Sequence, residues 1–389
     1  MKYRLEDICC FRKEKIAVSS LTLKNYISTE NMLPNKAGIT KATSLPKCNT
    51  TQRFECGDVL VSNIRPYFKK IWKAKFDGGC SNDVLVFSSK EGFDTEFLYY
   101  VLSDDSFFEY SMATSKGTKM PRGDKKSIMN YEVPCFDINI QIKTATILKS
   151  IDDKIELNNK INNNLEQQYI SIVDHLLSKL TQYKIYSLSE VADCQNGRAF
   201  YKEGYDPNGA FVIDLGNVNT FGNFVRTAAD KYISLDRYKE PKLEKYRVYK
   251  NDIVMVMTDR KSTMELLGKV GKIYKDGYYL LNQRMYRIRA KKGINTNYLY
   301  ACLNSTETSN FLKRKALGSV QKYVNTGEIN SIEIKVPSSE KMEEIASILD
   351  PIFSQMELNI LENESLTELR DIFLPKLMSG ELDVSDIDL

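Results

Sequence analysis

Histidine is almost absent from this chain, which removes the residue that most acid-base and metal chemistry depends on. Its 389 residues include one histidine and one tryptophan. The histidine, His175, falls in a helical stretch, so a histidine base or a histidine-rich metal site is nearly excluded. No apolar run is long enough to cross a bilayer, and no secretory leader opens the chain. We therefore expect a cytoplasmic protein with no membrane contact.

Cysteine is present but follows no pattern that indicates disulfide or metal chemistry. The eight cysteines include no CxxC pair and no regular framework. We expect them to be reduced thiols, most of them buried. They are Cys9, Cys10, Cys48, Cys56, Cys80, Cys135, Cys194 and Cys302.

Motifs for cofactor and nucleotide chemistry are also missing. A DNA adenine methyltransferase needs a glycine-rich cofactor loop and an Asn-Pro-Pro-aromatic or similar catalytic loop, and neither occurs. A translocase needs GxxxxGK[ST], which is absent, and no convincing nuclease metal cluster is found. The sequence therefore predicts a non-catalytic chain that binds no cofactor or metal itself.

Charge is segregated along the chain, although the net charge is only +4. Residues 1–136 hold 21 Lys and Arg against 16 Asp and Glu, and residues 182–337 hold 26 against 16. Residues 137–181 hold 5 against 6, and residues 338–389 hold 3 against 13. Two basic blocks are typical of polyanion binding, whereas the acidic end indicates a solvated face or a protein-docking surface.

An internal repeat organises the chain. Ile147–Asn158 returns as Ile348–Asn359 at a shift of 201 positions, and Gly117-Thr118 matches Gly318-Ser319 at the same shift. Gly57–Val61 resembles Asn251–Met255 at a shift of 194. This predicts two variable domains that alternate with two long helices. The predicted segments are a first domain at 1–136, a central helix at 137–181, a second domain at 182–338, a C-terminal helix at 339–381 and a tail at 382–389.

Each variable domain is predicted to be α+β. Short alternating runs such as Asp83–Phe87 and Arg284–Ile288 indicate strands, and Gly, Asn and Asp punctuate them. Phe97–Phe108 and its counterpart Tyr298–Leu312 space their apolar residues as one helix each would.

The two long helices have apolar stripes that can bury each other, with Asn158 and Asn162 near the seam to fix register. About 40 residues correspond to a rod of about 60 Å. The first stripe is Ile155, Asn158, Asn162, Leu165, Tyr169, Ile172, Leu176 and Lys179. The second is Ile348, Ile352, Leu358, Leu361, Leu366, Leu369, Phe373 and Leu377.

Three segments, together with the repeat, resemble the specificity (S) subunits of type I restriction-modification systems. They are Tyr26–Pro34 (YISTENMLP), Ile147–Asn158 (ILKSIDDKIELN) and Leu374–Leu382 (LPKLMSGEL). The resemblance covers nearly the whole chain. It implies two target recognition domains, each reading half of a bipartite asymmetric DNA site, with two antiparallel coiled-coil helices as a spacer.

The resemblance also implies partners. These are double-stranded DNA, two methyltransferase (M) subunits that bind S-adenosylmethionine and methylate adenine, and a restriction (R) subunit where the system has one. ATP and Mg would then be bound by partner subunits. The alternatives are a specificity module of a type IIB-like restriction enzyme, an independent DNA-binding regulator, and an enzyme in its own right.

Candidate DNA-binding residues fall in three sets, chosen because base edges need paired donors or acceptors and phosphates need cations. The family pattern places the first set, two matching loops, against DNA. It comprises Lys116, Thr118, Lys119 and Arg122 in one domain and Ser319, Gln321, Lys322 and Tyr323 in the other. The second set follows the strand anchors and comprises Asn63, Arg65, Tyr67, Lys69 and Lys70 in the first domain and Asp259, Arg260 and Lys261 in the second. The third is Asn282, Gln283 and Arg284. Solvated turn residues are the alternative for the loops, a core position for Tyr67, and a solvent-facing strand position for Arg284.

Overall fold

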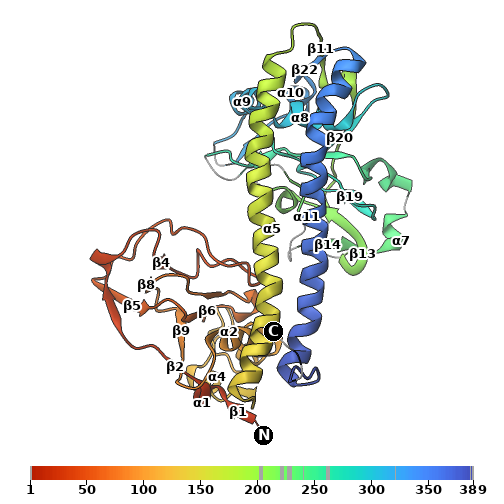
Figure 1. Cartoon of the computed structure of the whole chain (residues 1–389). Helices are drawn as coiled ribbons and strands as arrows, with labels where there is room; N and C mark the ends of the chain where they lie inside the picture. Colours follow the sequence, from red (N-terminus) through yellow and green to blue (C-terminus); the bar gives the residue numbers. More distant parts are fainter. Residues whose placement is uncertain are drawn as a thin grey trace. The chain divides into compact units, whose positions relative to one another are not determined.

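The computed structural model divides into two compact units. It describes residues 2–200, 205–219, 223–225, 230–239, 241–259, 263–319, 321–385 and 387. Unit 1 comprises residues 1–156 and 363–389, and unit 2 comprises residues 157–362. Each unit combines sheets with helices, so the chain is α+β as predicted (Figure 1).

Unit 1 is built on two four-stranded sheets with the strand orders β2-β9-β6-β7 and β3-β5-β8-β4, and a small sheet of β1 and β10. Its strands are β1 Lys2–Arg4, β2 Cys9–Phe11, β3 Lys15–Ala17, β4 Tyr26–Ile27, β5 Thr50–Phe54, β6 Val59–Ser62, β7 Ile71–Lys73, β8 Gly78–Cys80, β9 Val84–Ser89 and β10 Glu132–Pro134. Its short helices are α1 Leu5–Ile8, α2 Thr95–Ser103, α3 Asp105–Ala113 and α4 Lys125–Met129, with 3₁₀ turns at Val18–Ser20 and Pro66–Phe68.

Unit 2 repeats this plan with the strand orders β12-β20-β16-β18 and β14-β13-β19-β15, and with the pairs β11-β22 and β17-β21. Its strands are β11 Lys184–Ser187, β12 Ala192–Asn196, β13 Tyr205–Ile213, β14 Lys231–Ile233, β15 Arg247–Val248, β16 Ile253–Val256, β17 Thr258–Asp259, β18 Val270–Lys272, β19 Tyr279–Leu281, β20 Met285–Ala290, β21 Lys322–Tyr323 and β22 Glu333–Val336. Its helices are α6 Leu188–Val191, α7 Leu235–Tyr238, α8 Thr296–Asn304, α9 Thr306–Lys315 and α10 Thr326–Asn330, with 3₁₀ turns at Leu215–Asn217 and Pro241–Tyr246.

Two long helices contribute to both units. Helix α5 spans Ile138–Ser178 and α11 spans Ser339–Ser379, each 41 residues long, and their first residues lie at the 201-residue shift of the sequence repeat. Within unit 2 the helices are antiparallel, because Asn162 Oδ1 accepts a hydrogen bond from Asn359 Nδ2 at 2.7 Å while Tyr169 packs on Phe353 with ring centroids 4.7 Å apart.

The seam of the helix pair differs from the predicted one. In the unit 2 part of α5 the buried positions run Asn158, Asn162, Glu166, Tyr169, Val173 and Leu177, whereas Leu165, Ile172 and Leu176 are only partly buried. Most of these steps are four residues, a longer repeat than the 3.5-residue spacing of the predicted seam. In α11 the predictions for Ile348, Leu358 and Leu369 are wrong, because these side chains are 44%, 59% and 39% exposed.

The predicted single helix of each domain is two helices. Asp104 lies between α2 and α3 with extended backbone (φ −63°, ψ 140°), and its carboxylate accepts from the N–H of Ser106 at 2.8 Å. Ser305 separates α8 from α9 in the same way and accepts from Thr308 N–H at 3.2 Å. Each of these residues is the N-cap of a new helix. The spacing of apolar residues does not predict where one helix ends and the next begins.

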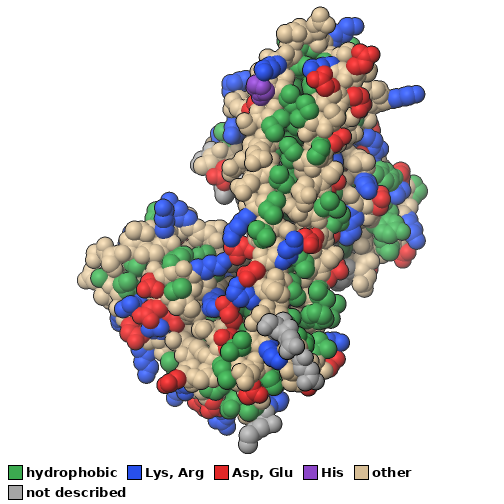
Figure 2. Space-filling model, viewed as in Figure 1, with side chains coloured by type: hydrophobic (Ala, Val, Ile, Leu, Met, Phe, Trp, Pro, Cys, Tyr) green, Lys and Arg blue, Asp and Glu red, His purple; other side chains and the backbone are tan. Residues whose placement is uncertain are grey.

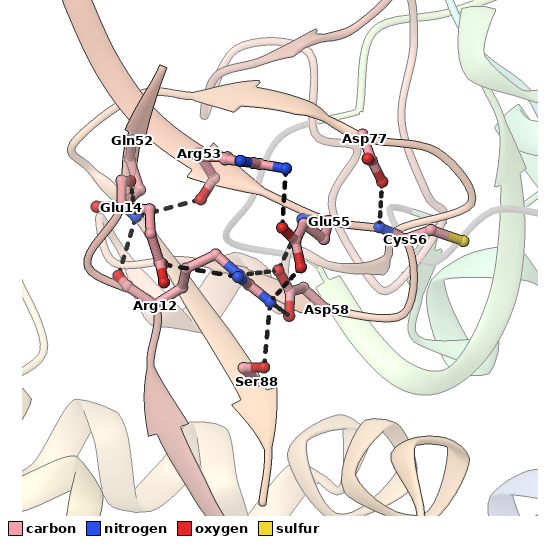
Figure 3. Close-up of polar contacts among 9 residues, drawn as sticks. All are labelled: Arg12, Glu14, Gln52, Arg53, Glu55, Cys56, Asp58, Asp77 and Ser88. Atoms are coloured by element: carbon pink, nitrogen blue, oxygen red, sulfur yellow. Dashed lines mark hydrogen bonds and ion pairs between the residues drawn. The ribbon is translucent and has the colours of Figure 1, made fainter.

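A buried carboxylate after a left-handed turn anchors the central sheet in both units. Asp58 in unit 1 and Asp252 in unit 2 are 3% and 2% exposed. Arg12 binds Asp58 through Nε and Nη2 at 2.6 and 3.2 Å (Figure 3). Arg289 binds Asp252 through the same two nitrogens, both at 2.7 Å. The carboxylate is therefore repeated, whereas its arginine comes from a different strand region in each unit.

The prediction that most cysteines are buried is wrong, because three of the eight, Cys9, Cys80 and Cys302, are buried. All eight are free thiols. In the part of the chain that the structure describes, no helix is both long and apolar enough to span a membrane.

Candidate nucleic-acid interface

Both predicted loops are hairpins that are closed by the same pair of backbone hydrogen bonds. In hairpin 1, residues 116–122, the N–H and C=O groups of Lys116 and Arg122 bond to each other at 2.9 and 3.0 Å. In hairpin 2, residues 317–323, Leu317 and Tyr323 exchange the same two bonds at 2.9 and 3.0 Å. The two pairs are related by the 201-residue shift, so one backbone framework presents two different sets of side chains.

A glycine with positive φ starts each hairpin. Gly117 and Gly318 both have φ of +92°, a conformation that a residue with Cβ adopts only at a cost. A Cβ at Gly318 would lie 2.1 Å from the carbonyl oxygen of Gln321. Because that oxygen belongs to the backbone, the hairpin itself would have to shift to remove the clash. The matched glycines noticed in the sequence are therefore required by the turn.

Each hairpin pairs with the strand end that carries the second candidate set. In unit 1, Ile64 bridges Arg122, and the N–H of Arg65 donates to the carbonyl of Pro121 at 2.8 Å. In unit 2, β17 pairs with β21, so Thr258 faces Tyr323. In unit 1 the structure therefore brings Arg65 of the second set beside hairpin 1. Arg260 and Lys261 lie outside the described residues.

Hairpin 1 presents exposed cations that are paired with acids on neighbouring segments. Lys116, 80% exposed along its side chain, forms an ion pair with Asp124. The hydrogen bond from Lys116, with a second from the N–H of Ser127, holds the pKa of Asp124 far below its usual value. Arg122, 56% exposed, lies 3.0 Å from an Asp83 carboxylate oxygen. Thr118 and Lys119 are exposed at the tip.

Hairpin 2 presents mainly uncharged side chains. Ser319 is exposed, Tyr323 is 40% exposed, and Gln321 and Lys322 are partly buried. Lys322 of β21 lies opposite Asp259 of β17 in the backbone pairing of these two strands. The Asp259 carboxylate accepts a hydrogen bond from the N–H of Leu266 at 2.7 Å. This surface can donate and accept hydrogen bonds but carries fewer cations than hairpin 1.

The residues that follow Arg65 are held by local contacts. Tyr67 is 48% exposed and packs on Phe68 with centroids 4.7 Å apart, so it is a surface residue and not a core one. Lys69 pairs with Asp105 at 2.7 Å. Burial lowers the pKa of Lys70, whose ammonium donates to the Thr29 carbonyl at 2.5 Å.

The third set lies at the end of β19 and the start of β20. Asn282 is 9% exposed and its side-chain oxygen accepts from the N–H of Gln283 at 2.8 Å, an arrangement that argues against direct base contact. Gln283 is exposed and Arg284 is partly buried. The Arg284 carbonyl accepts from Met257 N–H at 3.0 Å, which places Arg284 beside the segment that supports hairpin 2.

Several polar atoms under the two hairpins are buried without a hydrogen-bond partner among the residues that the structure describes. They are Asn63 Oδ1, Arg65 Nε, Thr258 Oγ1 and Gln321 Nε2. The other buried polar side-chain atoms without a partner among the described residues lie elsewhere in the two units, so these four atoms alone do not locate a ligand. The exposed polar side chains of each hairpin, held on a paired strand end, make this surface the candidate interface of each unit.

Two acidic residues of this surface were not predicted. Asp124 follows hairpin 1 directly and caps α4, so a carboxylate adjacent to a basic loop was a usable signal. Asp83 is far from Arg122 in the sequence, and no spacing rule connects them. Over the described ranges, no group of three or more His, Cys, Asp or Glu side chains is placed to hold a metal ion.

A family model and two similar proteins describe the same kind of protein. The family model described as "Type I restriction modification DNA specificity domain" matches residues 1–167 and 181–368. The type I restriction enzyme MjaVIII specificity subunit of Methanocaldococcus jannaschii is 25% identical over 321 residues, covering 76% of this chain and 72% of that protein. The HindI specificity subunit of Haemophilus influenzae is 23% identical over 455 residues, covering 98% and 99%.

A solved structure has the same fold. The crystal structure of the type I restriction-modification system S subunit from M. genitalium matches with a TM-score of 0.55 at 17% identity. The match covers 99% of this chain and 96% of that one.

Proposed function

This chain belongs to the type I restriction-modification DNA specificity family, and we propose that it reads a bipartite, asymmetric DNA site and directs adenine methylation there. Restriction would follow at unmodified sites when a nuclease subunit is present. The observation that carries the proposal is the pair of matching hairpins, which offer different side chains on one backbone. Two such surfaces suit two unlike half-sites.

Recognition in this proposal divides between charge and geometry. Lys119, exposed at the tip of hairpin 1, supplies phosphate attraction that weakens as salt rises, since phosphate contacts release counterions. Arg122 and Gln283 can form paired hydrogen bonds to base edges in the major groove. The lengths of α5 and α11 would set the spacing of the half-sites, with centres about one helical turn of DNA apart.

The chain itself performs no chemistry in this proposal. Two methyltransferase subunits would bind S-adenosylmethionine, and a restriction subunit would bind ATP and Mg. Exposed apolar side chains on α11 fit such protein partners: Ile348 and Leu358 in unit 2, and Leu369 and Ile372 in unit 1, are 39% to 59% exposed. Hydrophobic side chains are also seen along the helical face of unit 2 in Figure 2.

Modification-sensitive sequencing of host DNA tests the proposal. Cells with the intact gene and cells in which it is deleted would be compared, with expression of the partner methyltransferase verified in both. We expect methylation at one split adenine-containing motif to vanish on deletion. An unchanged methylome would overturn the proposal.

Two alternatives predict other outcomes. A specificity module of a type IIB-like restriction enzyme would differ in its partner, which would carry both methyltransferase and nuclease activities. An independent DNA-binding regulator would bind its site tightly without any methyltransferase. Affinity measured with and without the M subunits separates this second alternative from the proposal.

A further inference from the structure

One ion pair in unit 1 has no counterpart in unit 2, although the backbone around it is repeated. In unit 1 the backbone carbonyl of Asp83 accepts a hydrogen bond from the N–H of Asn63 at 2.8 Å. In unit 2 the backbone carbonyl of Arg284 accepts one from the N–H of Met257 at 3.0 Å. Asp83 and Arg284 therefore occupy equivalent positions. Arg122 and Tyr323 are also equivalent, because each closes its hairpin.

The Asp83 carboxylate is informative because it faces a surface expected to meet DNA. A phosphate contact needs only positive charge, and a neighbouring carboxylate would weaken it. Base reading needs a guanidinium whose planar fork faces the base edge, and the single contact with Asp83 restrains where that fork lies. Asp83 lies 3.0 Å from Arg122 Nη2 while more than half of the Arg122 side chain stays exposed. The remaining N–H groups can therefore reach a ligand.

We propose that Arg122, oriented by Asp83, reads a guanine in the half-site bound by unit 1. Guanine is the base that offers two acceptors, O6 and N7, on its major-groove edge, and these match the arginine fork. Asp83 is a positioning residue that does not touch DNA. The inference rests on the proposed function, because it assumes that hairpin 1 faces a base pair.

Unit 2 has neither residue of this arginine–aspartate pair at the equivalent positions. It has Tyr323 in place of Arg122 and Arg284 in place of Asp83, so the carboxylate is replaced by a cation on the neighbouring strand. The half-site of unit 2 is therefore read by a different arrangement of side chains. This is a physical reason for an asymmetric site.

The test uses the full chain in complex with its methyltransferase subunits and a randomised double-stranded DNA library. Bound sequences are counted for wild type, Arg122→Lys, Asp83→Asn and Lys119→Ala. Arg122→Lys keeps the charge but removes the fork, so preference for guanine at one position should fall ten- to a hundredfold. Asp83→Asn should reduce the same preference several-fold while raising affinity for random DNA.

Lys119→Ala is the matched control, because Lys119 lies in the same hairpin without an assigned base contact. It should weaken binding to all sequences and leave the base profile unchanged. Thermal melting of each variant verifies folding.

Three results would overturn the inference. They are an unchanged profile for Arg122→Lys with only a changed salt dependence, a change confined to the other half-site, and an intact guanine preference in Asp83→Asn. If the wild-type complex itself selects no bipartite motif, the proposed function fails and this inference fails with it. Failure of the variants alone leaves the proposed function standing.

A reciprocal exchange gives a gain of function as a second test. The double change Arg284→Asp and Tyr323→Arg installs the unit 1 pair on the equivalent backbone of unit 2. We expect a new guanine preference in the second half-site. A folded variant without that preference would count against the pair as the reading device.

Discussion

Units 1 and 2 have the same backbone plan but place their charges differently. Hairpin 1 has three cationic residues and hairpin 2 has one, although residues 182–337 carry the larger basic excess of the two variable domains. Equivalent carboxylates, Asp58 and Asp252, are bound by arginines from different strand regions. The repeat thus preserves backbone geometry and buried anchors, whereas side chains at exposed and supporting positions have diverged.

A large effect is expected from the shared anchor. Asp58→Asn should lower the free energy of unfolding by about 3 kcal/mol, because it neutralises the buried carboxylate that Arg12 contacts, although Glu55 and Glu14 remain 3.0 and 3.6 Å from the Arg12 guanidinium. Asp252→Asn should do the same in unit 2. Trp72, the only tryptophan and a core residue of unit 1, reports that unit by fluorescence in a urea titration. Asp58→Asn should shift the Trp72 transition more than Asp252→Asn does.

The control for this experiment is Asp77→Asn. Asp77 accepts the N–H of Cys56 at 2.8 Å in an exposed setting, so its replacement should cost little (Figure 3). Equal shifts of the Trp72 transition in the Asp58 and Asp252 variants would show that the units do not unfold separately.

Between pH 5 and 8.5 a pH effect is expected from a buried carboxyl group in unit 2. Burial raises the pKa of Glu166 to about 8, and nearby Lys269 only partly opposes this. Between its ordinary pKa of 4.5 and about 8 the folded state binds the extra proton, so this contribution to stability is complete below pH 4.5 and is lost as pH rises. Between pH 4.5 and 8 the loss should be about 5 kcal/mol, at about 1.4 kcal/mol for each pH unit.

Glu166→Gln should flatten this dependence, measured by far-UV circular dichroism in urea at pH 5 to 8.5. The equivalent position in α11 is Thr367, which donates to the Asn363 carbonyl at 2.7 Å and does not titrate. The Trp72 transition of unit 1 should therefore change less with pH. An unaltered slope in Glu166→Gln would assign the pH dependence to another group.

The hairpin glycines should differ in cost. Gly117→Ala should cost about 1–2 kcal/mol because alanine disfavours positive φ. Gly318→Ala should cost more, since its Cβ also meets the Gln321 carbonyl, whereas the nearest atom at Gly117 is 3.5 Å away. Thermal melting measures the cost, and DNA affinity with one half-site scrambled at a time measures the consequence. Equal costs would mean that the backbone of hairpin 2 relaxes.

The smallest effect is a change in salt dependence. Lys119→Ala and Lys322→Ala should each reduce the slope of log affinity against log salt by about 1 if the lysine contacts a phosphate. Because Lys119 is exposed at a hairpin tip and Lys322 is partly buried, we expect the larger change for Lys119→Ala. A larger change for Lys322→Ala would mean that hairpin 2 lies closer to the DNA backbone.

The sequence alone determined the features that depend on local pattern. The 201-residue shift placed both long helices in the repeat, and matched glycines located both hairpins. These predictions are possible because helical periodicity and positive-φ turns depend on residues that are close together in the sequence. The family followed from the same segments, since their order and spacing along the chain are specific.

Only the tertiary structure decided which distant residues meet. Asp83 orients Arg122 across 39 positions, and the arginine partners of Asp58 and Asp252 come from unrelated positions in the two units. The apolar pattern also did not predict the buried face of α11. Ile348 and Leu358 are exposed, whereas the polar Asn359 is buried against Asn162. Such contacts depend on how packed elements align in space, which local spacing does not encode.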